Sequence, residues 1–356
     1  MKKPHAYLFQ VLVFIGGIIL VDVTVHCAAV PQAPVATLSS AASPAVVKRA
    51  QMHMGTLVTV TGVASTDAVA QEAVMAAFRE IHRLEELLST WIPASELSRV
   101  NAAAGRDAIA VSAETFELLT RSMEISELTQ GGFNIAVGPA VEAWSVTERM
   151  RIPAQDELDR LKKIVDQAQI RLDGRARTVF LLKPNMRVDV SGIGKGFAAD
   201  RAAAVMQAAG ATAGVVALSG DIKTFGRFPD GARFRFGIRH PRNDGATIAT
   251  LDLENEAIST AGDYERYFER DGVRYHHILD PATLEPARRC QSVTVIASEG
   301  TLADGLDTGL FVMGPERGMA LVERLDGVEA VIVDHDGKVL VSSGLKNKIR
   351  FHEPAR

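Results

Sequence analysis

Two segments of this chain combine residue types that suit the binding of a phosphate-containing ligand together with a metal ion. The segment Asp189-Val-Ser-Gly-Ile-Gly-Lys-Gly196 places an acid, three glycines and a lysine before an expected helix. Glycines allow close backbone approach to a ligand, a lysine neutralises phosphate charge, and helix-terminal amides favour anions. The segment Ala303-Asp-Gly-Leu-Asp-Thr308 adds two carboxylates and a hydroxyl, oxygen donors that suit Mg²⁺. Together they predict a metal-assisted site, but they do not name the ligand.

Both segments also have ordinary structural interpretations. The glycine segment can be a plain turn between a strand and a helix, and the acids of the second segment can be the polar start of a helix. Two known phosphate-binding patterns are excluded. In a Walker A loop, a glycine would replace Asp189 and a Ser or Thr would replace Gly196, whereas a dinucleotide-binding fingerprint would have glycine at Phe197.

The composition fits a large folded enzyme or binding protein. The chain has 356 residues, of which 47% are hydrophobic and 23% charged, enough for the core of one large domain or two. The net charge of −4 and the lack of a recognisable motif give no reason to expect nucleic acid as a partner. Arg233, Arg235 and Arg239 alternate in a strand-like run, which predicts a solvent-exposed face.

The N-terminal region differs from the rest of the chain. Two lysines precede an apolar run over about residues 7–25, which is typical of a secretory leader, here assigned to residues 1–33. An N-terminal membrane anchor is the alternative, because the run approaches spanning length. Cys27 leaves open a lipid anchor, although His26 occupies a position where lipoproteins have a small residue. Residues 34–50, rich in Ala, Ser, Pro and Val, predict a flexible tether.

The remaining chain, residues 51–350, is expected to form one domain. The only cysteine in it is Cys290, so no disulfide framework is expected. Strong helical periodicity predicts a helix over Asp67–Leu88, and Ser112 is the expected N-cap of a second helix that ends at Leu128. Further expected helices are 156–165, 197–209, 304–312 and 315–325.

Expected strands are numerous and often follow one another without an intervening helix. They cover 56–61, 178–182, 187–190, 214–218, 234–238, 247–253, 256–259, 275–279, 292–297, 330–334 and 338–342. Residues 178–182 and 187–190 are expected to pair with each other, and 331–341 is expected to form a hairpin that turns at 335–337. This pattern favours an α+β fold, with mixed or antiparallel sheets flanked by helices, over a doubly wound sheet.

Eight segments in this order resemble motifs of the ApbE family of flavin transferases. They are Met54-Gly-Thr56, Ser89 to Asn101, Gly132 to Pro139, Asp189 to Gly196, Ser219-Gly-Asp-Ile222, Thr260-Ala-Gly-Asp-Tyr264, His277-Ile-Leu-Asp-Pro281 and Ala303 to Thr308. Each motif is weak alone, but the ordered set spans almost all of the chain after the tether.

The resemblance implies a Mg²⁺-dependent FAD:protein FMN transferase. Such enzymes split the pyrophosphate of FAD, attach FMN through a phosphoester to a threonine or serine of a target protein, and release AMP. Their targets include flavin-bearing subunits of membrane redox complexes. Many members are periplasmic, which agrees with the expected leader and predicts an exported, periplasmic protein. Some relatives instead hydrolyse FAD to FMN and AMP.

The resemblance also assigns roles to individual residues. The Gly192 carbonyl, Asp304 and Thr308 would hold Mg²⁺, Lys195 would neutralise FAD phosphate, and Asp189 would hydrogen-bond the cofactor. His277 is the first candidate for the base that accepts the target hydroxyl proton, and Asp307 is the second. A structural hydrogen bond is the alternative for His277. The residues expected to line the FAD site are Met54, Trp91, Gly132, Phe133, Asn134 and Ile278, with Trp91 either stacking on a flat ring or lying half-buried in the core.

Several positions depart from the family pattern. Asn134 replaces an acid, Ala136 replaces a threonine, and Ala261 replaces a serine, whereas Asp307 adds an acid. An asparagine can still form hydrogen bonds, but it cannot act as a base or as a charged metal ligand. Two alternatives to FMN transfer therefore stay open: an FAD pyrophosphatase that yields FMN and AMP, and an FAD-binding periplasmic protein with little turnover.

Overall fold

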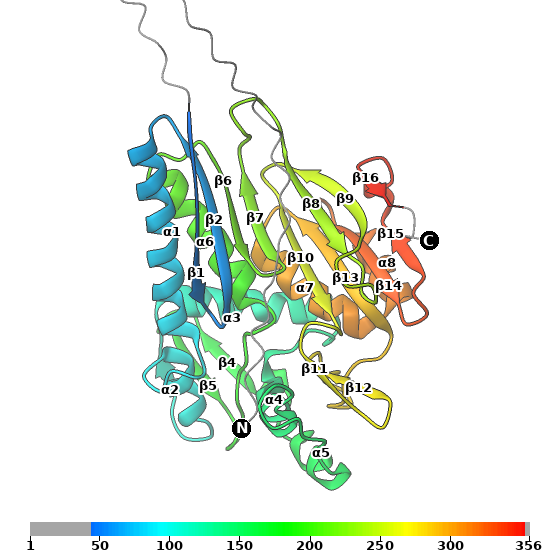
Figure 1. Ribbon diagram of the computed structural model, residues 1–356. Helices are drawn as coiled ribbons and strands as arrows, with labels where there is room; N and C mark the ends of the chain where they lie inside the picture. The colour runs from blue at the N-terminus through cyan, green and yellow to red at the C-terminus, as the bar shows by residue number, and fades with distance from the viewer. Residues whose placement is uncertain (1–43, 353–356) are drawn as a thin grey trace, which may run out of the picture. The chain divides into compact units, whose positions relative to one another are not determined.

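The structure, a computed structural model, describes residues 44–352 (Figure 1). The expected leader and Cys27 lie outside the described residues. Within residues 44–352, no helix has both the length and the apolar character needed to cross a bilayer. The first strand, β1 (Ala45–His53), begins inside the segment predicted as tether, so the predicted boundary at residue 50 was wrong. β1 shows little hydrophobic patterning because most of its residues are exposed, and its pairing with β2 (Thr56–Ala64) keeps it extended.

The centre of the fold is an eight-stranded sheet in which every pair of neighbours is antiparallel. Its strands, in spatial order, are β1, β2, β6 (Ala213–Leu218), β7 (Asp221–Phe225), β10 (Ala257–Gly262), β13 (Cys290–Ala297), β14 (Glu329–Asp334) and β15 (Val339–Val341). All eight residues of β13 are buried, as expected of a strand that is covered on both faces. The predicted hairpin is confirmed, because Val331 pairs with Val341 across the turn.

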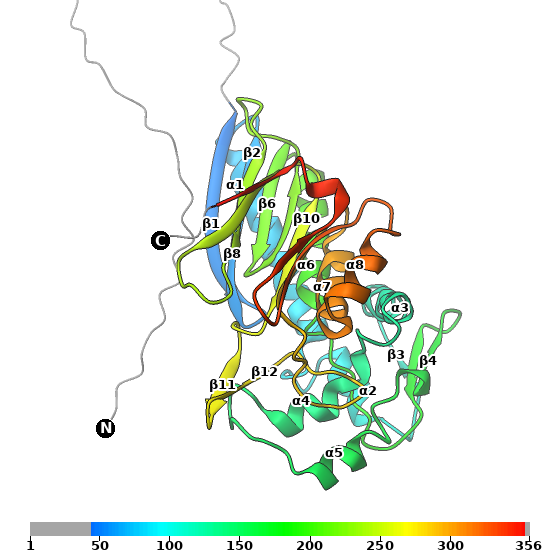
Figure 2. The same ribbon diagram turned by 90° about the vertical axis from the view of Figure 1, so that its right-hand side faces the viewer.

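Helices cover one face of this sheet (Figures 1 and 2). They are α1 (Asp67–Leu88), α6 (Gly194–Ala208), α7 (Gly300–Met313) and α8 (Pro315–Val322). α1 has the predicted bounds, and the Thr66 side chain accepts a hydrogen bond from the backbone N–H of Val69 at its start. α3 (Ala113–Leu128) packs against α7. Ser112 is its N-cap, as predicted. Three short helices lie outside this layer: α2 (Glu96–Ala102), α4 (Gly138–Trp144) and α5 (Gln155–Leu161).

A three-stranded sheet covers part of the other face. Its strands are β16 (Ile349–Phe351), β9 (Thr247–Leu253) and β8 (Phe234–Arg239), and their apolar side chains pack against Ile258, Ile296 and Val331 of the large sheet. The arginines of β8 face outward, as predicted, and Arg235 donates a hydrogen bond to Asp252 at 2.7 Å. The α+β prediction is confirmed, and the pairings in the described chain are antiparallel throughout.

The smaller elements lie beyond the large sheet. One small sheet has the order β3 (Ile109–Ala110), β5 (Thr178–Leu181), β4 (Ile170–Asp173), and another pairs β11 (Tyr267–Arg270) with β12 (Val273–His276). The 3₁₀ helices are η1 (Ile135–Val137), η2 (Gln167–Gln169) and η3 (Ser343–Leu345).

The predicted pairing of residues 178–182 with residues 187–190 was wrong. β5 pairs with β3 and β4, and residues 187–190 do not form a strand. The Asn101 side chain holds Val188 instead, because it accepts from the Val188 N–H at 2.7 Å and donates to its carbonyl at 3.0 Å. The next residue, Asp189, donates its backbone N–H to the Ile135 carbonyl at 2.8 Å. These contacts place the glycine-rich segment beside η1.

Candidate active site

The starts of α6 and α7 approach each other at two glycines. A Cβ atom on Gly196 would lie 2.1 Å from the Gly300 carbonyl oxygen, and one on Gly300 would lie 2.7 Å from the Gly196 oxygen. No other residue type fits either position without moving backbone. The close approach lets the Gly196 N–H donate to Asp304 Oδ2 at 2.8 Å. The glycine-rich segment and the second acidic segment therefore meet, although they are distant in the sequence.

Three buried carboxylates gather at this crossing. Asp304 and Asp307 come from α7, and Asp221 comes from the first position of β7. One oxygen from each lies within 4.8 Å of the others, and each residue is at most 3% exposed. Lys195, from the first turn of α6, forms an ion pair with Asp221. One ammonium thus faces three carboxylates.

The charges in this cluster perturb each other. Burial raises the pKa of Asp304, and the negative charge of Asp221 raises it further. Burial also raises the pKa of Asp307 well above its usual range, and Asp304 and Asp221 add to the effect. Burial alone would lower the pKa of Lys195, but the carboxylates outweigh it and the net shift is upward. The cluster therefore favours additional positive charge.

The position of the Ser259 hydroxyl also indicates that the cluster favours additional positive charge. Its Oγ, on β10, lies 2.6 Å from an oxygen of Asp307 and also within hydrogen-bond distance of an oxygen of Asp221. A hydroxyl has one proton, so it can donate to only one of these carboxylates at a time. The second close oxygen–oxygen contact needs a proton or a cation to neutralise the repulsion.

The donor set fits Mg²⁺, a hard cation that binds oxygen ligands. Asp304 and Thr308 are four residues apart on α7 and therefore share a face of the helix. The Thr308 hydroxyl donates to Asp307 Oδ1 at 3.1 Å, and a Cβ atom on Gly192 would lie 3.1 Å from Thr308 Oγ1. The structure thus brings together the three residues predicted to hold the metal. Their coordination of an ion stays a prediction.

Residues expected at the FAD site border the glycine-rich turn. The Met54 methyl group lies 4.0 Å from the position that a Cβ atom would occupy on Gly194, and the Phe133 ring lies 3.5 Å from the corresponding position on Gly192. Asp189 is partly buried and accepts a hydrogen bond from the Ser191 N–H at 2.8 Å, which shapes the turn before α6. The glycine-rich turn is therefore bordered by side chains from two other parts of the chain.

His277 follows β12 and is partly buried. Burial lowers its pKa to about 3, and the positive charges of Arg266 and Lys195 contribute. The imidazole is therefore neutral at pH 7. Its Nδ1–H can donate to the Arg266 carbonyl at 3.2 Å, which leaves Nε2 with a free lone pair. This arrangement accommodates both interpretations of His277, as a structural hydrogen-bond donor and as a base.

Comparisons with known proteins all point to one family. The model of the ApbE family matches residues 54–332. FAD:protein FMN transferases from Vibrio cholerae and Treponema pallidum are 34% and 33% identical, with 75% and 85% of this chain covered and 82% and 88% of theirs. The ApbE crystal structure from Thermotoga maritima superimposes with a TM-score of 0.78 at 31% identity, covering 85% of this chain and 98% of that one. The flavin transferase ApbE from Vibrio cholerae gives 0.77 at 30%, with 86% and 99% covered.

This chain belongs to the ApbE family. The glycine-rich motif and the motif that carries Asp304 meet at the carboxylate cluster, and two further residues join them there. Asp221 was visible only as part of the Ser-Gly-Asp-Ile turn motif, and Ser259 directly precedes the Thr-Ala-Gly-Asp-Tyr motif. Both become site residues only because β7 and β10 are neighbours in the sheet.

The remaining ApbE-motif residues have other contacts. Trp91 is 80% exposed, so its interpretation as a half-buried core residue was wrong, while stacking on a flavin stays a prediction. Asn134 accepts the Ala136 N–H at 2.8 Å and caps η1. A Cβ atom on Gly132 would lie 2.8 Å from the Gly309 carbonyl oxygen, so this glycine permits close contact with α7. Ile278 is buried in the main core.

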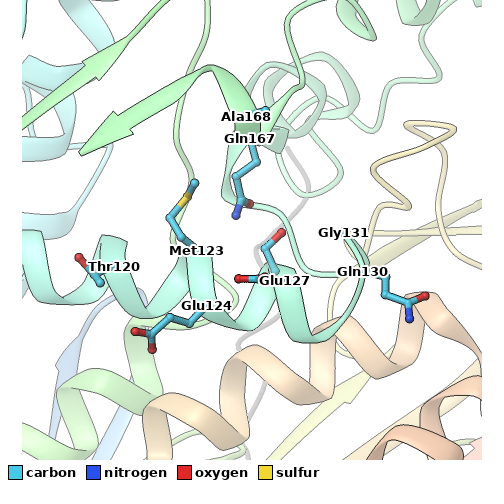
Figure 3. A pocket seen from close by; sticks show the side chains of 9 residues that line it. Thr120, Met123, Glu124, Glu127, Gln130, Gly131, Gln167 and Ala168 are labelled. Atoms are coloured by element: carbon cyan, nitrogen blue, oxygen red, sulfur yellow. The ribbon is translucent and has the colours of Figure 1, made fainter. Parts of the chain in front are cut away.

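A surface hollow elsewhere does not belong to this site. It has a volume of about 570 Å³ and lies between α3 and η2 (Figure 3). Met123, Glu124, Glu127 and Gln167 are among its lining residues, which include none of the carboxylates of the cluster. We therefore place the candidate active site of this ApbE-family protein at the α6–α7 crossing.

Proposed function

We propose that this protein is a Mg²⁺-dependent FAD:protein FMN transferase that attaches FMN to a threonine or serine of an acceptor flavoprotein. The observation that carries the proposal is the meeting of Lys195 with three buried carboxylates at the glycine-rich turn. The family membership supports it, because relatives that share about a third of their residues with this chain are named for this reaction.

The proposed reaction is a phosphoryl-type transfer. The acceptor hydroxyl oxygen attacks the phosphorus of the FMN half of FAD and forms a new P–O bond. The bond from that phosphorus to the bridging oxygen breaks, and AMP leaves with the bridging oxygen. The hydroxyl proton passes to Nε2 of His277, or to Asp307 if His277 is structural. Positioning and charge neutralisation supply most of the catalysis in such transfers.

The charge of each residue determines its proposed role. Lys195 places its ammonium where it can neutralise the pyrophosphate, and Asp221 holds that ammonium in position. Asp304, Thr308 and the Gly192 carbonyl would hold Mg²⁺, which supplies positive charge for the developing negative charge on the phosphate oxygens. His277 is neutral at pH 7, as a proton acceptor must be, and a bound pyrophosphate would raise its basicity by offsetting Lys195.

The direct test combines the protein with FAD, Mg²⁺ and a threonine-bearing acceptor domain. We expect mass spectrometry to show the acceptor heavier by one FMN unit, with one AMP released per modified acceptor. Acceptor with valine in place of the threonine should stay unmodified. Asp304→Asn retains an acceptor for the Gly196 N–H but loses the charge, so it should abolish turnover, whereas the exposed Asp336→Asn should not.

Other outcomes identify the two alternatives. FMN and AMP released without any acceptor would show an FAD pyrophosphatase. Tight FAD binding without AMP release would show a binding protein, the function that Asn134 and Ala261 favour. In that case, Asn134→Asp should gain activity if the missing acid is the cause.

We also propose that the protein acts on the exported side of a membrane, on a flavin-bearing subunit of a membrane redox complex. The predicted leader in residues 1–33 supports this location. Fractionation of cells that express the full chain, together with the mass of the mature protein, tests it. A full-length protein recovered in the cytoplasm would refute export.

A further inference from the structure

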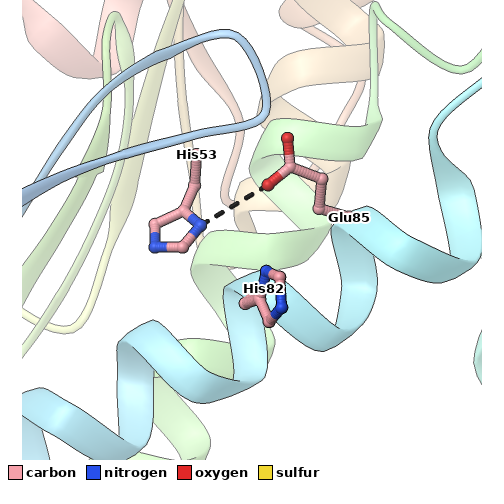
Figure 4. Close-up of side chains that lie close together, drawn as sticks. All are labelled: His53, His82 and Glu85. Carbon is pink, nitrogen blue, oxygen red and sulfur yellow. Dashed lines mark ion pairs between the residues drawn. The ribbon is translucent and has the colours of Figure 1, made fainter. Parts of the chain in front are cut away.

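A second group of side chains with the chemistry of metal ligands lies at the turn between β1 and β2, against α1 (Figure 4). It consists of His53 at the end of β1 and of His82 and Glu85, three residues apart on α1. One ligand atom from each residue lies within 4.8 Å of the others. His53 Nδ1 and Glu85 Oε2 are 3.4 Å apart, and the His53 and His82 rings are 5.8 Å apart.

The hydrogen bonds around this group leave its ligand atoms free. The Gln51 side-chain oxygen lies 3.0 Å from His53 Nε2 and can accept its N–H, which leaves the Nδ1 lone pair facing Glu85. Glu85 accepts the Met54 N–H through Oε1 at 2.7 Å, so Oε2 remains available. Histidine ligands of metals usually donate their second N–H to an oxygen acceptor in this way.

Charge and packing agree with this arrangement. His53 is the only basic group within 4 Å of the Glu85 carboxylate among residues 44–352. Glu86 adds a second carboxylate 3.7 Å from His82 Nε2. The His53 ring stacks on the Phe78 ring with 5.9 Å between the ring centroids, and this contact fixes the orientation of His53. The His82 side chain, by contrast, is 60% exposed and free to rotate.

We propose that His53, His82 and Glu85 bind Zn²⁺ or a divalent transition ion of the same class, with water as the fourth ligand. Two imidazoles and one carboxylate suit Zn²⁺, whereas Mg²⁺ prefers oxygen ligands. A tetrahedral ion with ligand distances of about 2.0–2.1 Å separates its ligand atoms by about 3.3–3.4 Å. The His53–Glu85 pair already has this separation. A rotation of the exposed His82 side chain brings in the third ligand.

The bound ion would stabilise the hairpin turn that carries Met54. Met54 has a left-handed backbone with φ of 49°, and its N–H is held by Glu85. Its methyl group reaches the Gly194 position in the glycine-rich turn. Zn²⁺ on Glu85 would therefore fix β1 to α1 and hold Met54 in place, without taking part in the chemistry at the carboxylate cluster.

Calorimetric titration of the chelator-treated full chain with Zn²⁺, in excess Mg²⁺, tests this proposal. We expect one tight equivalent, with affinity at least about tenfold weaker in His82→Ala and in Glu85→Gln. Neither change should unfold the protein, because His82 is exposed and Gln keeps an oxygen for the Met54 N–H. The matched control is His335→Ala, which removes another exposed histidine that neighbours acids and should leave binding unchanged.

Substitution with Co²⁺ gives a second readout, since four-coordinate Co²⁺ absorbs visible light strongly and the absorption should disappear in His82→Ala. The proposal is overturned if the wild-type chain takes up no stoichiometric Zn²⁺, or if both variants retain full affinity. It is also overturned if binding survives in His82→Ala but disappears in Asp304→Asn, because the ion would then occupy the carboxylate cluster.

Discussion

Replacing Asp307 with asparagine should stabilise the protein when Mg²⁺ is absent. Asp307 is buried with Asp221 and Asp304, and each has an oxygen within 4.8 Å of the others. At that distance and an effective dielectric constant of about 20, each like-charged pair costs about 3.5 kcal/mol. Asp307 faces two such charges, and Lys195 offsets about one of them, so at a pH above the raised pKa of Asp307 the variant should gain about 3 kcal/mol.

The side chain of asparagine is nearly the same size as that of Asp307, and it can keep the hydrogen bonds with Ser259 and Thr308. Its oxygen accepts from Ser259, and its amide can donate to the Thr308 hydroxyl. Thermal unfolding with a chelator and with saturating Mg²⁺ measures the effect. Without metal, the melting temperature should rise by about 5–10 °C. With Mg²⁺ the difference should narrow or reverse, because the wild-type cluster binds the ion more tightly and gains more stability from it.

The pH dependence has a definite sign. The pKa of Asp307 is raised in the folded protein. The free-energy cost of burying its charged carboxylate is therefore fully present above that raised pKa, and it disappears as the pH falls through the raised pKa towards the usual value of a carboxyl group. The matched control is Asp263→Asn, which removes a buried acid that accepts two hydrogen bonds from Arg242, at 2.7 and 2.6 Å. This control should be less stable than wild type under both conditions. A metal-free Asp307→Asn protein that melts below wild type would refute the reasoning.

Three further predictions address the helix crossing, the pH range and the proposed base. Gly196→Ala should cost at least about 2 kcal/mol in urea unfolding, because its Cβ meets backbone at 2.1 Å, whereas Gly174→Ala, with its nearest neighbour at 3.7 Å, should stay within about 0.5 kcal/mol. Burial lowers the pKa of His276 from 6.5 to about 4, so this one histidine should cost the folded protein up to about 3 kcal/mol as the pH falls through that range. His276→Gln should flatten this pH dependence, and parallel curves for the two proteins would contradict it. His277→Gln should slow FMN transfer about 10²–10⁴-fold at unchanged FAD affinity, and an unaltered single-turnover rate would exclude His277 as the base.

Local sequence patterns predicted the elements whose stability comes from one apolar face and clear end signals. The helix over Asp67–Leu88 and the helix behind Ser112 have the expected bounds because periodic apolar residues and a capping side chain define them. The hairpin at residues 335–337 follows from its turn residues. The spacing of Asp304 and Thr308 likewise places both on one helix face. Such features depend only on neighbours within a few residues.

Contacts between distant segments were not predictable in this way. The tether predicted over residues 34–50 overlaps the first part of β1, because an edge strand with mostly exposed side chains carries no period-two signal. β5 was assigned the wrong partner, since strand pairing depends on which segments the whole fold brings together. Ser259 was not recognised as a site residue for the same reason.

The candidate site shows the division most clearly. Residue types and family motifs alone identified Lys195, Asp304 and the glycine-rich turn as candidate site residues, because each lies in a short sequence motif. The tertiary structure decided that Asp221 and Ser259 join them, and that the acids share one buried space with a single lysine. Two glycines permit the helix crossing that creates this space. Burial and charge repulsion arise only from that proximity, and they give the acids their affinity for positive charge.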